Sequence, residues 1–313
     1  MTKKVVLFGG GTGLSHILSE LKHYDLDLTA VVTVADNGGS TGKIRNFYDI
    51  PAPGDLRRCA IALSEDPSLQ EIMNYRFDQK LNKHTVGNLI LTAYTDMYGD
   101  MKKACDAYCK MLKVKHTVLP ISNESLQLCA TMESGVEICG ETQISTYPEK
   151  ISKLYYQGEV SILPEVIKAV NEADAIIFSC GSLYTSIVCN LLFKDLIDAF
   201  DQNQGKIIYI CNLMTQRGET EKYQVSDHIN VINSYLNKHK IDCVIANNNY
   251  DVSAKVLENY YQEKAKLVTL DQDKIIYLDL ISDDYLYIDQ LDHIRHNIRK
   301  ICKTIYQYIN QGN

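Results

Sequence analysis

The chain has 313 residues, of which 45% are apolar and 23% charged, a composition typical of a globular protein that can bury a large core. Its formal net charge is −7 and it has no basic run or arm, so nucleic acid is not expected as a partner. No stretch approaches the roughly 18 apolar residues of a membrane span, and the apolar run at 5–8 is too short for a targeting signal. We therefore expect a cytoplasmic protein without a membrane span.

The first 35 residues predict a strand, a helix and a second strand. The apolar run at 3–8 is followed by the glycine-rich loop 9–13. A helical pattern begins near Leu14, and residues 28–35 are continuously apolar, as in a parallel strand that is covered on both faces. This order of elements is a βαβ unit.

Residues 36–163 differ in texture from the segments on either side. The stretch 36–58 is polar, glycine-rich and long for a plain connection, which favours a functional loop. Alternating runs at 127–132 and 136–140 predict an antiparallel hairpin. Helices are predicted around 55–64, 67–77, 87–97 and 100–112. We interpret about 60–163 as a helical and β-hairpin insertion in a single domain that spans 1–313.

From residue 164 the alternation of helices and strands returns. Strands are predicted at 174–179, 206–211 and 242–246, and a β-rich stretch at 266–280. Helices are predicted at 164–172, from the Gly181 loop through Leu191, at 194–202, 226–238 and 252–263, and from about 289. The expected fold class is α/β: a doubly wound, mostly parallel, Rossmann-like sheet with helices on both faces and a small antiparallel β insertion.

Several polar loops follow predicted strands, at the edge where open α/β sheets bind ligands. In the first loop, glycine lets the backbone approach a phosphate, and the next helix offers unpaired N–H groups. The spacing matches neither the dinucleotide fingerprint nor the P-loop, and a tight turn is the alternative. The candidate ligand residues in this loop are Gly10, Gly11, Thr12 and Gly13.

The second loop begins with Asp36, which ends the second predicted strand, where a Rossmann acid would meet a ribose hydroxyl. A solvated loop or a helix cap is the alternative. Its candidate ligand residues are Asp36, Asn37, Gly38 and Ser40.

Two further loops follow the strands predicted at 174–179 and 206–211. The first of them offers an uncharged nest of hydroxyl and N–H donors, and the second offers side chains that can contact a sugar or a base edge. Ordinary caps and turns are the alternative. The candidates are Gly181, Ser182, Thr185, Ser186, Asn212, Thr215 and Gln216.

Two other positions stand at predicted helix starts. Asp55 serves either as an N-cap or as a Mg²⁺ ligand beside a diphosphate, with Asp36 as the other weak candidate for that metal. Asn88 is a candidate ligand contact because Gly87 leaves room beside it, whereas a lone His84 is more often structural. No other metal site and no catalytic residue is predicted. The ten cysteines are expected to be reduced, mostly buried thiols.

The order of the motifs is more specific than any single loop. They are GGGTGLS from Gly9, TVADNGGSTGKIR from Thr33, PAPGDLR from Pro51, H-x-x-GN from His84, GSLYTS from Gly181 and CNLMTQRGET from Cys211. Together they closely resemble the gluconeogenesis factor family, the bacterial branch of the CofD-like superfamily, over nearly the whole chain. The founding relative of that superfamily is 2-phospho-L-lactate transferase, which moves a phospholactyl group from a nucleotide-activated donor to a deazaflavin.

The resemblance implies a nucleotide site formed by these loops, with Arg295 contacting a phosphate and Tyr260 close by. The bacterial branch is associated with UDP-sugars such as UDP-N-acetylglucosamine and with growth on gluconeogenic carbon sources, cell shape and peptidoglycan synthesis. Two positions depart from the family pattern: Ser179-Cys180-Gly181 stands where the family has GPG, and Arg217 stands where it has proline. Asn37 replaces an aspartate of some members and removes a metal ligand.

Three functions follow from these patterns. The main hypothesis is a regulatory UDP-sugar-binding protein without catalysis. Its expected partners are further copies of the chain and a protein that the sequence does not identify. A phospholactate-transferase-type enzyme that uses a nucleotide-diphosphate donor and Mg²⁺ is the first alternative. An NAD(P)-dependent oxidoreductase is the second, although the incomplete glycine fingerprint argues against it.

Overall fold

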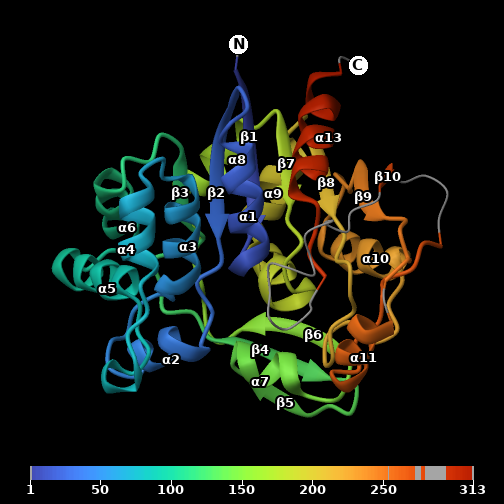
Figure 1. Cartoon of the computed structure of the whole chain (residues 1–313), viewed down its shortest axis with the longest axis horizontal. Helices are drawn as coiled ribbons and strands as arrows, with labels where there is room; N and C mark the ends of the chain where they lie inside the picture. Colours follow the sequence, from blue (N-terminus) through green and yellow to red (C-terminus); the bar gives the residue numbers. More distant parts are fainter. Residues whose placement is uncertain (1, 253, 272–275, 279–293, 312–313) are drawn as a thin grey trace.

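The computed structural model describes residues 2–252, 254–271, 276–278 and 294–311, and a parallel sheet forms its centre (Figure 1). Seven strands follow the order β3-β2-β1-β7-β8-β9-β10, and every neighbouring pair is parallel. Their bounds are β1 Lys3–Gly9, β2 Leu26–Val32, β3 Thr117–Pro120, β7 Ala175–Phe178, β8 Lys206–Ile210, β9 Cys243–Asn247 and β10 Ile276–Leu278. The doubly wound parallel sheet that the sequence predicts is confirmed.

Apolar side chains on both faces explain why these segments form central strands. All four residues of β7 are buried, as are the last five of β1. The rings of Phe8, Phe178 and Phe200 form one cluster, in which the Phe8 centroid lies 6.0 Å from that of Phe178 and 5.5 Å from that of Phe200. Strands that are buried on both faces need cover from helices on both sides.

The helices supply that cover. In Figure 1, α1 and α3 lie in front of the sheet and α8 and α9 lie behind it. The helices bordering the sheet are α1 Gly11–Leu21, α3 Pro53–Leu63, α8 Pro164–Asn171, α9 Lys194–Gln202, α10 Val225–Tyr235 and α13 Ile298–Asn310. Helix α11 Ala254–Gln262 lies beyond the carboxyl ends of the strands (Figure 1). A peripheral group comprises α2 Gly39–Arg45, α4 Pro67–Asn74, the 3₁₀ turn η1 Gln79–Leu81, α5 Val86–Tyr98 and α6 Met101–Met111.

A second, antiparallel sheet lies at the carboxyl ends of the central strands (Figure 1). It has the order β5-β4-β6, with β4 Leu128–Met132, β5 Glu137–Cys139 and β6 Ile151–Tyr156, and the short helix α7 Glu141–Thr146 connects β5 to β6. The predicted hairpin is therefore present and gains a third strand. The segment 60–163 also contributes β3 to the edge of the main sheet. The domain boundaries stay a prediction.

Four local predictions differ from the structure. Helix α1 begins at Gly11 rather than near Leu14, because the glycine loop itself forms the first turn. The polar stretch 36–58 contains helix α2. The segment after Gly181 forms a π turn, η2 Leu183–Ile187, and a 3₁₀ turn, η3 Val188–Leu192, instead of an α-helix. Helix α13 begins at Ile298, and the earlier start predicted at 289 lies outside the described residues.

Candidate functional site

The main sheet has its switch point between β1 and β7. From β1 the chain continues to β2 on one side, and from β7 it continues to β8 on the other side. The two loops that follow β1 and β7 therefore diverge and leave a crevice between them. They also approach each other closely: a Cβ added to Gly13 would lie 2.8 Å from the carbonyl oxygen of Cys180, so only glycine fits there.

One cavity opens beside the glycine loop, and we call it the glycine cavity. Its volume is about 350 Å³. Gly10 is the N-cap of α1, and as a glycine it supplies no side chain to cap the helix. The Gly11 N–H is hydrogen-bonded to the Asp55 carboxyl, which leaves the other N–H groups of the first turn available to an anion. The cavity is lined by Gly10, Gly11, Thr12, Gly13, His16, Cys180, Gly181, Ser182, Ser186, Asn212, Leu213, Met214, Gln216, Tyr260, Ile294, Arg295, His296 and Ile298.

Two side-chain amides build the wall opposite α1. The Asn212 amide donates to the carbonyl oxygen of Gly181 at 3.0 Å, and the Gln216 amide donates to the Ser182 hydroxyl at 2.9 Å. These bonds fix the loop after β7. They leave Asn212 Oδ1 and Gln216 Oε1 buried without a hydrogen-bond partner. Two unpaired acceptors in one wall are suited to a ligand that brings N–H or O–H donors.

The segment just before α13 builds the other end of the glycine cavity. Tyr260 is buried, and its hydroxyl accepts a hydrogen bond from the backbone N–H of Ile294 at 3.0 Å. Burial lowers the pKa of His296 to about 4, so its ring is neutral and donates Nε2–H to the Cys211 carbonyl at 3.1 Å. Burial, followed by the charge of Arg295, also lowers the pKa of His16. The exposed Arg295 supplies the positive charge in this cavity.

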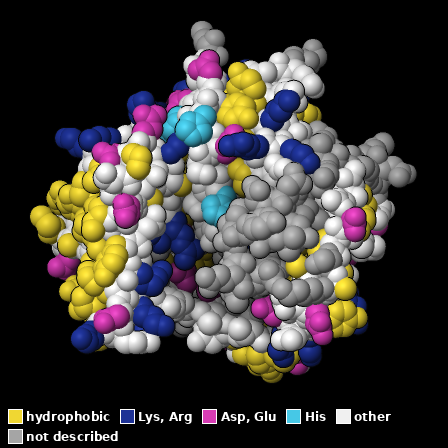
Figure 2. All heavy atoms as spheres, in the orientation of Figure 1, with side chains coloured by type: hydrophobic (Ala, Val, Ile, Leu, Met, Phe, Trp, Pro, Cys, Tyr) yellow, Lys and Arg dark blue, Asp and Glu magenta, His cyan; other side chains and the backbone are white. Residues whose placement is uncertain are grey.

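A second cavity lies on the far side of the glycine loop, and we call it the arginine cavity. Its volume is about 390 Å³, and it shares Gly11, Thr12, Ser182 and Ser186 with the glycine cavity. Figure 2 shows a hollow on this face of the molecule, with Lys and Arg side chains gathered along one side. The other lining residues are Thr33, Asp36, Gly38, Gly39, Ser40, Thr41, Gly54, Asp55, Arg57, Arg58, Arg76, Asn88, Glu141 and Thr185.

Three carboxyl groups face the arginine cavity. Asp55 is buried against the glycine loop, and burial raises its pKa although Arg58 lies 3.3 Å away. Asp36 accepts a hydrogen bond from the N–H of Gly38 at 2.8 Å. Burial, together with the charge of Asp36, raises the pKa of Glu141 to about 7. The three groups therefore repel one another, which disfavours full ionisation of all three.

A hydrogen-bonded chain of side chains links α2 to α5 at the rim of the arginine cavity. Ser40 Oγ lies 2.8 Å from His84 Nδ1 and accepts a hydrogen bond from Asn88 Nδ2 at 3.0 Å. Burial lowers the pKa of His84, and Lys43 and Arg76 lower it further. Nδ1 of the neutral ring then accepts a hydrogen bond from the Ser40 hydroxyl. His84 is a hydrogen-bond partner of Ser40 and does not line the arginine cavity.

The loop GSLYTS is shaped by a carboxyl group from the next loop along the sheet. Glu219 is 2% exposed, and its two oxygens accept from the Tyr184 N–H at 3.0 Å and the Thr185 hydroxyl at 2.8 Å. Burial raises the pKa of Glu219. This pairing holds Thr185 at the edge of the arginine cavity and accounts for the irregular turn η2.

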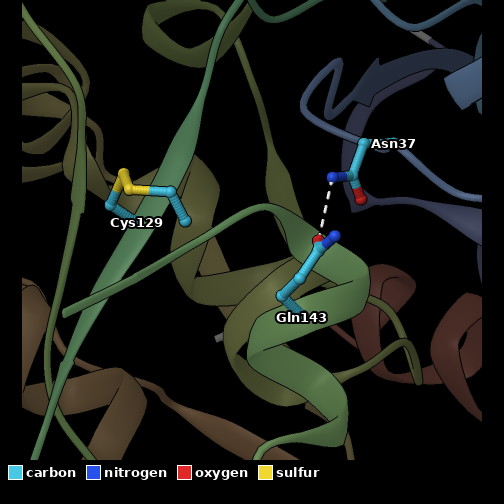
Figure 3. The surroundings of a disulfide bond; sticks show 4 residues. Asn37, Cys129 and Gln143 are labelled. Carbon is cyan, nitrogen blue, oxygen red and sulfur yellow. Dashed lines mark hydrogen bonds between the residues drawn. A yellow bond between two sulfur atoms is a disulfide. The ribbon is translucent and has the colours of Figure 1, made fainter. Parts of the chain in front are cut away.

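Helix α7 closes the arginine cavity from the second sheet, and two links fix it there. Asn37 Nδ2 donates to Gln143 Oε1 at 3.1 Å, and Asn37 Oδ1 accepts from the Thr142 N–H at 3.0 Å (Figure 3). Just before α7, Cys129 and Cys139 form a disulfide between β4 and β5 (Figure 3). The prediction that all ten cysteines are reduced is wrong for this pair. The antiparallel register sets the two directly opposite, with Cα atoms 4.1 Å apart, which spacing along the chain does not reveal.

Most of the ligand residues predicted from the sequence lie around the two cavities, with two exceptions. Asn37 lines a third, neighbouring cavity instead. Thr215 is buried, and its hydroxyl accepts from the N–H of Lys266 at 3.0 Å, which ties two loops together. Four charged residues of the arginine cavity, Arg57, Arg58, Arg76 and Glu141, were not predicted as ligand residues. Arg57 ends the PAPGDLR motif and Arg58 follows it, whereas Arg76 and Glu141 stand in none of the motifs. No local pattern marks those two, because only the tertiary fold brings them to the cavity.

The donor set at Asp36 and Asp55 suits one kind of metal only. Among the described residues, no group of three or more His, Cys, Asp or Glu side chains is arranged to hold a metal ion. Mg²⁺, however, needs only one or two protein carboxylates when water and phosphate oxygens complete its shell. Both aspartates line the arginine cavity, so this pair fits Mg²⁺ beside a phosphate and does not fit a cage made only of protein ligands.

The fold and the cavities define the class of protein: a doubly wound α/β protein with two polar cavities at the switch point of its sheet. None of the helices among the described residues is long and apolar enough to cross a membrane. Comparison with known proteins identifies the family within this class.

The family model described as 2-phospho-L-lactate transferase CofD matches residues 5–285. The chain is 38% identical over 313 residues to the gluconeogenesis factor of Bacillus subtilis strain 168, covering 98% of each chain. It is 41% identical to the putative gluconeogenesis factor of Thermotoga maritima, covering 96% of this chain and 98% of that protein. The crystal structure of protein BH3568 from Bacillus halodurans matches with a TM-score of 0.91 and 37% identity, covering 98% of this chain and 100% of that one. This chain belongs to the CofD-like family and, within it, to the gluconeogenesis factors.

Proposed function

We propose that this protein binds a UDP-sugar, such as UDP-N-acetylglucosamine, in the glycine cavity and acts as a regulatory factor rather than as an enzyme. The observation that carries the proposal is the pair of unpaired acceptors, Asn212 Oδ1 and Gln216 Oε1, in the same cavity as the start of α1. The N3–H of a uracil ring would satisfy one of these acceptors and a ribose or sugar hydroxyl the other, and a diphosphate suits a helix N-terminus.

The remaining lining residues have roles that fit the same ligand. Arg295 offers a planar fork of donors to a phosphate, and Tyr260 offers a buried ring beside it. Gly181, Ser182 and Ser186 border the cavity where the two loops meet, so their N–H and hydroxyl groups can contact the diphosphate. The sugar then lies toward the rim shared with the arginine cavity.

At the level of the cell, we propose a role in growth on gluconeogenic carbon sources, in cell shape and in peptidoglycan synthesis. The gluconeogenesis factors among its relatives support the first part, and the wall-related part follows from the proposed ligand. We also propose that the protein acts in the cytoplasm. Eight of its ten cysteines are unbridged thiols, seven of them buried, which is typical of a reducing compartment; the Cys129–Cys139 disulfide is the exception.

Ligand binding tests the proposal directly. Titration calorimetry and thermal unfolding with UDP-N-acetylglucosamine, UDP-glucose, GDP and NAD compare the candidate ligands. UDP-sugar at about 100 times its Kd should add roughly 2.7 kcal/mol and raise Tm by a few degrees. Arg295→Ala should weaken binding about tenfold or more, whereas Arg299→Ala, four residues on and outside the cavity lining, should not. Binding of GDP or NAD in preference to both UDP-sugars would contradict the proposal.

A group transferase of the phospholactate type is the second candidate. Asp36, Asp55 and Glu141 face a cavity that adjoins the proposed nucleotide site, which is where a metal-assisted transfer would need carboxylates. Asp36 and Asp55 would hold Mg²⁺, which would neutralise the charge of a diphosphate. Incubation with a nucleotide-activated phospholactyl donor, a deazaflavin and Mg²⁺ should then give nucleotide and phospholactyl-deazaflavin. Absence of product, with Mg²⁺-independent binding of UDP-sugar, would remove this candidate.

A further inference from the structure

Arg57 in helix α3 is a buried cation without an ion-pair partner. Arg57 is 4% exposed, and among the described residues no carboxylate lies within 4.0 Å of its side-chain nitrogens. Its Nη1 donates to Asn74 Oδ1 at 2.7 Å, whereas its Nε has no hydrogen-bond partner. An unpaired buried guanidinium is costly unless an anion approaches it.

The groups around Arg57 make its surroundings still more positive. Arg58 and Arg76 line the same cavity, and burial, followed by the charge of Arg58, lowers the pKa of Arg57 to about 10. Arg58 is paired with Asp55 at 3.3 Å, and the exposed Arg76 donates to the Lys83 carbonyl at 2.7 Å. Three guanidiniums from α3 and the segment after α4 therefore converge on one cavity, in a geometry suited to the oxygens of a phosphate.

A second unsatisfied group points to the chemistry of the rest of the ligand. Asn88 is 3% exposed and lines the arginine cavity; its Nδ2 donates to Ser40, whereas its Oδ1 has no partner. An unpaired acceptor next to an anion site needs a donor from the ligand. A hydroxyl group close to a phosphate provides that donor.

The carboxyl groups of the same cavity do not cancel this site. Asp55 is engaged by Arg58, and burial raises its pKa. Burial and its acidic neighbours raise the pKa of Glu141 to about 7, so near neutral pH it carries only part of a charge. Asp36, on the side of α2, caps the Gly38 N–H. Asp36 lies in the loop after β2, and Asp55 and Glu141 lie at the starts of α3 and α7. Arg76 comes from the segment after α4, and Asn88 from α5.

We propose that the arginine cavity binds a second ligand, a small hydroxylated phosphate monoester, at the same time as the nucleotide sugar occupies the glycine cavity. Arg57, Arg58 and Arg76 hold the phosphate, and Asn88 Oδ1 accepts from the hydroxyl. The glycine cavity has its own anion-binding groups, the start of α1 and Arg295, so the arginines are not needed for the nucleotide diphosphate. The inference goes beyond the proposed function and can be tested even if that function fails.

Glycerol 3-phosphate is the test ligand, with inorganic phosphate and glycerol as the two partial ligands. Calorimetry on the full chain should show one glycerol 3-phosphate site, with inorganic phosphate binding more weakly and glycerol not at all. Arg58→Gln and Arg76→Gln should each weaken binding about tenfold or more. Both side chains are at least partly exposed, so these variants should fold. Lys110→Gln, which removes the same charge from the exposed side of α6, is the matched control and should bind as the wild type does.

The decisive comparison repeats the titration at saturating UDP-N-acetylglucosamine. Persistence of the arginine-dependent site supports the proposal, and so does the same site in a protein that fails to bind any UDP-sugar. Loss of glycerol 3-phosphate binding when the nucleotide is present would overturn it, because the arginines would then hold the nucleotide's own phosphates. Equal binding by the wild type, Arg58→Gln and Arg76→Gln would also overturn it. Equal affinity for inorganic phosphate and glycerol 3-phosphate would contradict the proposed hydrogen bond between the ligand hydroxyl and Asn88 Oδ1.

Discussion

The glycine cavity and the arginine cavity share a rim but are built in opposite ways. The glycine cavity uses backbone N–H groups, amides and hydroxyls from loops that directly follow the parallel strands. The arginine cavity uses charged side chains that come from separate helices and from the second sheet. The shape of the glycine cavity therefore depends on the close approach of two backbone loops, whereas the shape of the arginine cavity depends on how the peripheral elements pack against the core.

The largest effect is expected from a substitution that forces apart the two backbone loops of the glycine cavity. Gly13→Val places a side chain against the Cys180 carbonyl, because even a Cβ would lie 2.8 Å from that oxygen. The two loops must separate, so UDP-sugar binding should fall at least roughly 100-fold and stability by about 1 to 3 kcal/mol. Calorimetry and urea unfolding measure both. Gly135→Ala, in a turn with nothing within 4 Å of the added Cβ, should cost about 1 kcal/mol through its positive φ and leave binding intact.

The next largest effect is expected when the disulfide of the second sheet is reduced, and it should fall mainly on ligand binding in the arginine cavity. Reduction of the Cys129–Cys139 disulfide opens a loop of 10 residues, which should cost about 2 to 3 kcal/mol by chain entropy. The disulfide immediately precedes α7, so glycerol 3-phosphate binding should weaken more than UDP-sugar binding. Unfolding and titration with and without a thiol reductant measure this. Cys139→Ser should be insensitive to the reductant, and an equal loss of both ligands would contradict the separation of the cavities.

A smaller effect is expected from substitution of Glu219, whose carboxyl group holds the GSLYTS loop at the rim shared by the two cavities. Glu219→Ala leaves the buried Tyr184 N–H without its acceptor and should cost about 1 to 3 kcal/mol. Glu219→Gln keeps one acceptor for that N–H and should restore most of the stability. Denaturant unfolding of the three proteins checks the order. Both cavities border this loop, so affinity for both ligands should follow the same order as stability.

The smallest effect is a dependence on pH that belongs to the arginine cavity. The pKa of Glu141 is about 7 in the folded protein against 4.5 for an ordinary glutamate, so the folded state retains a proton that the unfolded chain releases between those values. Stability should therefore fall as pH rises from about 4.5 to 7, on the order of 1 kcal/mol because the side chain is partly exposed. Urea unfolding across that range should show a flatter profile for Glu141→Gln. An identical profile in the two proteins would contradict this assignment.

How much could be predicted from the sequence also differs between the cavities. The central strands were recognisable because they are continuously apolar, and the glycine loop because it follows the first strand directly. Gly10, Ser182 and Gln216 all lie where a strand ends, and the edge of a parallel sheet brings such positions together without further information. The order of the strands at the switch point then completes the glycine cavity.

The arginine cavity was only partly predictable. Asp36 and Asp55 stand in glycine-rich segments that attract attention, whereas Arg76 and Glu141 stand in ordinary ones. Their positions depend on the docking of α4, α5 and α7, which is a matter of long-range packing. The disulfide and the contact between Asn37 and α7 depend on the register of β4 with β5 in the same way. Local patterns carry no information on either.

A crystal structure of the protein with UDP-N-acetylglucosamine and glycerol 3-phosphate tests the central claim most directly. The account predicts uracil N3–H on one of the two acceptors, Asn212 Oδ1 or Gln216 Oε1, and a ligand hydroxyl on the other. It also predicts the diphosphate at the start of α1 near Arg295 and the phosphate monoester on Arg57, Arg58 and Arg76. A nucleotide diphosphate seated on Arg57, Arg58 and Arg76, with the uracil away from Asn212 and Gln216, would contradict it.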